Sequence, residues 1–270
     1  MKMKKTAILT ALVLLVVSTV FLSGCAVVNI PGVIKQVKRQ SVSMDGISNL
    51  KIDLGYKNVT VLSNEGDTLE IRDYMISDNV KLHSTVSVSG DTITVSDAPG
   101  RANKTYKVEI AIPKTYKGTL SMSLIAGEVY AETDLTDYEN ITLNLQNGQM
   151  TMQKLEAKTI SLNVGNGKIK TKSIKGMASC SVNSGTIAVS MDGLTADLTL
   201  DVERGTLDLT LPQDAAFHLK AKAERGTVKV TGTEEKIHVS GETVSKAIGM
   251  SPEYTIKASV GSGTINISVK

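Results

Sequence analysis

The sequence predicts an all-β protein, a β-helix or solenoid whose coils of about 20 residues stack on one another. Two observations predict this fold class. A glycine-centred unit recurs seven times along the second half of the chain. Within each unit, apolar and polar residues alternate with the period of two that is typical of a strand with one buried and one exposed face.

The first 24 residues predict a signal peptide. Lys2, Lys4 and Lys5 form a basic start, and residues 7–22 are an uncharged, mostly apolar stretch. This stretch is shorter than the roughly 20 residues that a membrane-spanning helix needs. The small-residue site that ends the segment resembles the lipobox of bacterial lipoproteins and consists of Leu22, Ser23, Gly24 and Cys25.

The lipobox resemblance implies cleavage after residues 1–24 and lipidation of Cys25 by a diacylglycerol with palmitate-like chains. An uncleaved membrane anchor with an incidental cysteine is the alternative. Either interpretation predicts a protein held at the bacterial cell membrane and facing the extracytoplasmic side. Residues 25–45 are then the lipidated cysteine and a short tether, and residues 46–270 are the β-strand-repeat solenoid.

Residues 46–116 alternate less regularly than the rest of the solenoid. Short alternating runs separated by turn residues predict early, irregular coils of the same stack, joined by longer loops. Residues 117–270 contain the regular glycine-centred repeats. Within them, residues 233–254 predict one irregular coil before the last unit.

The seven units align on a glycine that recurs at intervals of 21, 19, 18, 20, 21 and 37 residues: Gly127, Gly148, Gly167, Gly185, Gly205, Gly226 and Gly263. Residues seven, five and three positions before the glycine, and two and four after it, are apolar in every unit except at Thr171. We expect these residues to form the core. Cys180 occupies one of these positions, which predicts a buried thiol without a redox or nucleophilic role.

The repeat glycine is expected to turn the chain. The residues three before and two after it are both predicted to point inward although they are five positions apart, so the chain must change direction between them. Glycine accepts a positive φ there without steric cost. Asn147-Gly148 and Asn166-Gly167 are also compatible with tight hairpin turns, so a row of hairpins is an alternative. The constant period favours the solenoid.

In-register stacking places equivalent residues of neighbouring coils beside one another. Asp201 would then pair with Lys222, and Asp208 with Lys229. The residues four positions before the glycine would form an outward-facing polar ladder that includes Ser123, Asn144, Asn163, Ser181 and Ser259.

Composition and motifs argue against several classes of function. Without residues 1–24 the chain has 27 basic and 27 acidic residues, so nothing points to nucleic acid. His83, His218 and His238 are far apart and are expected to be single surface or turn residues, so no metal site is predicted. No phosphate-binding loop or catalytic constellation is present in the sequence, and no cofactor is expected.

The run that ends in Ile112-Pro113, followed by repeated Gly-x-Val/Ile-x-Val units, resembles the bacterial "putative adhesin" domains with β-strand repeats. Leu211-Pro212, followed by Phe217 and another glycine unit, is similar to the same family. The resemblance covers about residues 46–270 and implies a right-handed single-stranded β-helix exposed at the bacterial surface. Members are linked to adhesion by name and, in some cases, to cell-envelope stress responses.

These observations predict a lipid-anchored interaction module of the bacterial envelope that is not an enzyme. Its partner would be an envelope or host protein or glycan. The alternative is a lipoprotein that senses envelope stress or regulates a membrane partner. A carbohydrate-active β-helix enzyme is a minor alternative, because such enzymes need carboxylates clustered on one face.

Overall fold

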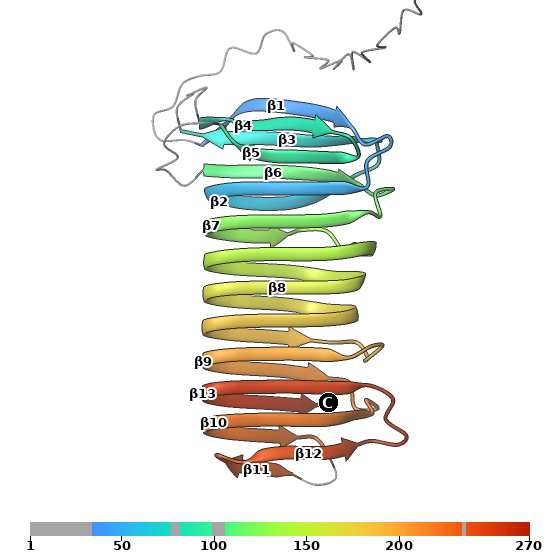
Figure 1. The fold of residues 1–270 in the computed structure, drawn as a ribbon, viewed down its shortest axis with the longest axis vertical. Helices are drawn as coiled ribbons and strands as arrows, with labels where there is room; N and C mark the ends of the chain where they lie inside the picture. The colour runs from blue at the N-terminus through green and yellow to red at the C-terminus, as the bar shows by residue number, and fades with distance from the viewer. Residues whose placement is uncertain (1–33, 77–81, 99–105, 234–235) are drawn as a thin grey trace, which may run out of the picture.

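The computed structural model describes residues 34–76, 82–98, 106–233 and 236–270, and these residues form an all-β structure (Figure 1). The strands belong to one 13-stranded sheet. They are β1 (Lys35–Ser43), β2 (Asn49–Asn64), β3 (Thr68–Met75), β4 (Ser84–Ser89), β5 (Thr92–Asp97), β6 (Tyr106–Pro113), β7 (Thr119–Ala131), β8 (Leu135–Ser190), β9 (Leu198–Leu211), β10 (Phe217–Thr231), β11 (Ile237–Ser240), β12 (Thr243–Ile248) and β13 (Thr255–Val269). Within the ranges described, no helix has the length and apolar character that a membrane crossing requires.

The central strands stack in parallel and in register. β7 pairs with β8 so that Gly127 faces Gly148, and β8 pairs with β9 so that Gly185 faces Gly205. Figure 1 shows these strands as successive turns along the long axis of the molecule. Hairpin neighbours would be antiparallel, so the row of hairpins is wrong for this part of the chain.

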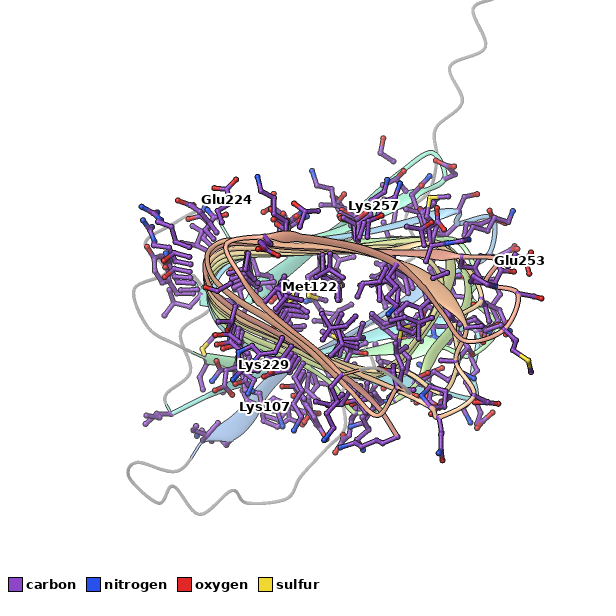
Figure 2. The ribbon with its side chains drawn as sticks, turned by 90° about the horizontal axis from the view of Figure 1, so that it is seen from below. Lys107, Met122, Glu224, Lys229, Glu253 and Lys257 are labelled. Atoms are coloured by element: carbon purple, nitrogen blue, oxygen red, sulfur yellow. The ribbon has the colours of Figure 1, made fainter. Side chains whose placement is uncertain are left out.

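The predicted inward rows form the core. Every predicted inward position of the seven units is buried, Cys180 and Thr171 included. Thr171 satisfies its hydroxyl by donating to the carbonyl oxygen of Ser173 at 3.2 Å. In the view along the stack, Met122 lies inside the ring of strands, whereas Lys257 lies outside it (Figure 2).

At the repeat glycines, an added side chain would overlap the backbone of the neighbouring turn. All seven have φ between 135° and 155°. A Cβ at Gly167 would lie 1.7 Å from the carbonyl oxygen of Gly148, and a Cβ at Gly148 would lie 1.8 Å from that of Gly127. The glycine therefore meets two demands, a positive φ and the absence of any side chain beside the neighbouring backbone.

The order of the last coils differs from the prediction. β13 lies between β9 and β10 and pairs in parallel with both. Asp201 consequently faces Ser259 instead of Lys222, and Asp208 accepts a hydrogen bond from Asn266 Nδ2 at 2.8 Å instead of meeting Lys229. The two predicted ion pairs are therefore wrong. All three strands carry the same repeat, so sequence register alone does not decide which of them are neighbours.

The irregular segments mostly cover the ends of the stack. β2 forms a turn that pairs in parallel with β7, and β5 and β6 pair with its first and second halves. β3 and β4, which were expected to be coils, pair antiparallel with β6 and β5. Residues 233–254, also expected to be a coil, contain β11 and β12, which lie antiparallel on β10.

The segment expected to be a tether is partly structured. β1 occupies Lys35–Ser43 and pairs antiparallel with β3. Its sequence is largely polar, because an edge strand gains its backbone hydrogen bonds from one neighbour and needs little buried surface. The signal peptide, the lipobox and Cys25 lie outside the described residues.

Candidate functional site: a polar groove

An open groove of about 660 Å³ runs across neighbouring turns on the outer face of the stack. It is lined by β2, β7 and β8, through residues that lie one to four positions before the repeat glycine, a position that we call the corner of the turn. In β2 this corner is Lys57, the residue whose carbonyl oxygen the Gly127 corner approaches. The polar side chains that line it are Asp53, Ser123, Asn144, Gln146, Asn147, Asn163, Asn166, Ser181 and Asn183. We call this surface the polar groove.

The local sequence explains why these side chains face outward together. Asn144 lies between the buried residues Leu143 and Leu145, so the strand period of two turns its side chain to the solvent face. In-register stacking then repeats this position from turn to turn. The groove lining also includes Gly165, two positions before the corner, which contributes no side chain.

Hydrogen bonds connect the amides along the groove. Asn163 Nδ2 donates to Asn144 Oδ1 at 2.9 Å, and Ser181 Oγ donates to Asn163 Oδ1 at 3.2 Å. In a second row, Asn166 Nδ2 donates to Asn147 Oδ1 at 3.0 Å. These bonds fix the orientation of the amides. Each amide has two donor hydrogens and two acceptor lone pairs, so capacity for an external ligand remains.

The groove is largely uncharged. Asp53 is the one carboxylate among its lining residues, and Ile125, 39% exposed, adds an apolar contact. The arrangement presents fixed donors and acceptors beside apolar surface, which suits a neutral ligand rich in hydroxyl or amide groups. Paired carboxylates for general acid and base catalysis are not among the lining residues.

Most residues of the polar ladder predicted from the sequence line the groove. The predicted ladder places Ser123, Asn144, Asn163 and Ser181 in the groove, whereas Ser259 lies further along the stack, beside Asp201. The repeat glycines form the row next to the groove. At Asn147 and Asn166 the sequence predicts only a turn, whereas the structure places both side chains in the groove with the 19-residue spacing of the repeat.

The remaining singled-out residues lie elsewhere. Burial raises the pKa of the Cys180 thiol to about 12, so it stays protonated and unreactive. His218 and His238 are exposed as expected, but His83 is buried just before β4, where its carbonyl oxygen accepts a hydrogen bond from the backbone N–H of Ala98. Among the described residues, no three His, Cys, Asp or Glu side chains form a group that could hold a metal ion.

The chain matches the Toastrack DUF4097 family model over residues 33–179 and again over residues 133–268. It belongs to the Toastrack family. The two overlapping matches cover β1 to β13, which includes the polar groove and both ends of the stack.

Two solved structures are among those similar to this Toastrack chain. A "putative cell adhesion protein" from Clostridium sporogenes is 16% identical, with a TM-score of 0.38, over 86% of this chain and 99% of that chain. A "putative adhesin" from Bacteroides fragilis is 15% identical, with a TM-score of 0.41, over 87% of this chain and 97% of that chain. The comparison with curated proteins found no match.

Proposed function

We propose that this Toastrack chain is a lipid-anchored, extracytoplasmic binding module of the bacterial envelope and that its ligand lies in the polar groove. Lipidation at Cys25 follows from the lipobox in the sequence. The observation that carries the binding proposal is the pair of hydrogen-bonded amide rows across neighbouring turns. They form a rigid, uncharged recognition surface on a stack whose backbone is fixed by parallel ladders.

The ligand class we propose is a neutral glycan of the envelope or of a host surface. Hydroxyl groups pair with amides as both donors and acceptors. Successive turns lie about 4.8 Å apart, so an extended chain ligand can meet equivalent groups on several turns. We also propose the right-handed, single-stranded path with coils of about 20 residues; the offsets from Thr119 to Asn140 and from Ala178 to Leu198 support this coil length.

A glycan array tests the binding proposal. The detergent-solubilised full chain should bind a subset of neutral glycans. The double variant Asn144→Ala with Asn163→Ala should lose roughly tenfold affinity or more, because two or more hydrogen bonds are removed. Gln149→Ala is the matched control, since this exposed side chain of the same strand lies outside the groove.

Two results would contradict this proposal. One is the absence of glycan binding by the unaltered chain, and the other is equal affinity of the groove variant and the Gln149→Ala control. If a deletion strain showed altered envelope-stress signalling without any binding defect, the regulatory function would be favoured instead. Mass spectrometry of the membrane-extracted protein tests lipidation, with the diacylglycerol adduct expected on Cys25.

A further inference from the structure

One residue breaks the glycine row. In β2, the residue at the corner position is Lys57, whose carbonyl oxygen lies beside the Gly127 corner. A side chain fits here because the turn beyond β2 is split between β5 and β6, which pair with its two halves. The Lys57 side chain fills this space and is only 1% exposed.

The ammonium group of Lys57 lies between two carboxylates from different strands. Its Nζ is 2.8 Å from Oδ1 of Asp97 on β5 and 4.0 Å from Oδ1 of Asp73 on β3. Nζ also donates to the carbonyl oxygen of Leu82 at 3.2 Å. Three segments at this end of the stack, β5, β3 and the residue Leu82, therefore hold this nitrogen in place.

Both carboxylates are themselves positioned by neighbours. The backbone N–H of Gly55 donates to Asp97 Oδ2 at 2.7 Å, and a Cβ at Gly55 would lie 3.0 Å from this oxygen. Ser84 donates to Asp73 through its backbone N–H at 3.1 Å and through its hydroxyl at 2.8 Å. The two carboxylates thus have different surroundings. Asp97 Oδ1 faces the lysine nitrogen, whereas Asp73 is held by Ser84 and lies further from that nitrogen.

We propose that Lys57 and Asp97 become joined by an intramolecular amide bond, formed by the folded protein itself with Asp73 as the acid–base group. The lysine nitrogen beside a fixed carboxyl is a near-attack arrangement of the reacting groups. The Gly55 N–H donates to the oxygen that gains negative charge in the tetrahedral intermediate, as in an oxyanion hole. Lys57 and Asp73 are each 1% exposed and Asp97 is 21% exposed, so the attacking nitrogen is shielded from bulk water, which favours condensation over hydrolysis.

The reaction balances without any co-reactant. A proton moves from the Lys57 ammonium to the carboxylate of Asp97, which leaves a neutral amine and a carboxylic acid. The nitrogen lone pair forms a bond to Cγ, and Asp73 takes a proton from the nitrogen. Asp73 passes that proton to Oδ1, the Cγ–Oδ1 bond breaks, and one water leaves. Ammonium plus carboxylate becomes amide plus water, and Asp73 ends as it began.

The bond would join β5, and with it the antiparallel strand β4, covalently to β2. It closes a covalent loop between residues 57 and 97, which restricts the unfolded chain as a disulfide does. It would do so in a chain whose cysteine among the described residues is a free, buried thiol.

Mass spectrometry of the full chain decides the proposal. The intact protein should be lighter than its processed sequence by the mass of one water, about 18 Da. Trypsin should fail to cut after the acylated Lys57 and should release a branched peptide made of residues 52–72 and 82–101. The exposed pair Lys158–Glu139, with an N···O distance of 2.6 Å, serves as an internal control and should stay unlinked.

Three variants separate the roles of the groups. Lys57→Arg keeps a positive charge but should abolish the mass loss. Asp73→Asn should leave the two strands unlinked while Lys57 and Asp97 are still present. Asp97→Asn should release ammonia and lose about 17 Da. If the folded, unaltered protein has its full mass and trypsin cuts after Lys57, the proposal is overturned, and Lys57 is held by ionic contacts alone.

Discussion

The corner of each repeat turn accepts glycine because any other residue would add a Cβ atom there. At Gly167 the φ angle is 143°, and an added Cβ would overlap the carbonyl oxygen of Gly148. The hydrophobic pattern of the sequence predicts the turn. It does not predict the close approach, because the contacting backbone belongs to another turn. Lys57 agrees with this explanation, because a side chain occupies the corner position of β2, where the neighbouring turn is divided between β5 and β6.

Gly167→Ala should lower the free energy of unfolding by about 2 kcal/mol or more, because it adds both steric overlap and backbone strain. Chemical denaturation of both proteins measures the difference. Gly193→Ala is the matched control: its added Cβ would meet nothing within 4 Å, so a change below about 0.5 kcal/mol is expected. Equal stability of the two variants would refute the packing of the corner.

Cys180 should make stability depend on alkaline pH. Burial raises its pKa in the folded state from 9.0 to about 12. The unfolded chain therefore loses this proton at lower pH than the folded chain. The contribution of the protonated thiol to the free energy of unfolding is thus complete below pH 9 and is lost between pH 9 and about 12. Comparing unfolding of the unaltered protein and Cys180→Ala from pH 8 to 10 isolates this effect.

The same burial predicts that a thiol reagent labels Cys180 only after unfolding. Labelling of the native protein at the same rate as the denatured protein would contradict its place in the core. Cys180→Ala reports any background from other sites.

At the scale of one element, the alternation along a strand predicts burial well. β9 shows it clearly, since Val202 is fully buried and Thr199 on the same strand is exposed. The pattern is reliable because the strand period is fixed by backbone geometry and not by the partner strand. The direction of short strands was less predictable: β3 and β4 alternate like the others but pair antiparallel.

Val202→Asp should destabilise the protein by more than about 3 kcal/mol, because a carboxylate enters the apolar core without a partner. Thr199→Asp adds the same charge on the outer face, where Thr199 pairs with Lys257, and should change stability by less than about 0.5 kcal/mol. Thermal unfolding of both variants provides the comparison. An unchanged midpoint for Val202→Asp would show that the inward row is misassigned.

At the scale of the whole molecule, both ends of the stack contain a strand inserted between two others. β2 lies between β6 and β7, and β13 lies between β9 and β10. The terminal repeat turns are thereby paired on both sides, and antiparallel strands cover what would otherwise be open parallel edges. Such covering reduces edge-to-edge association between copies.

Paired cysteines test this strand order. In a Cys180→Ala background, Thr199→Cys with Lys257→Cys should form a disulfide on mild oxidation, because these residues are direct partners. Thr199→Cys with Lys220→Cys should not, because β13 separates their strands. Peptide mapping under non-reducing conditions identifies the bond, and the opposite outcome would restore the sequential order of turns.

The sequence by itself determined the all-β class, the inward rows, the corner glycines and the polar ladder from which much of the groove is built, because each depends on local backbone period and residue size. Only the tertiary structure decided which turns are neighbours, where the antiparallel end strands lie, and which charged side chains form ion pairs. Turns that share one repeat are interchangeable in register, so their order follows from chain connections and end packing. For the same reason, Lys57, Asp73 and Asp97 gain their relation to one another only when three separate strands meet.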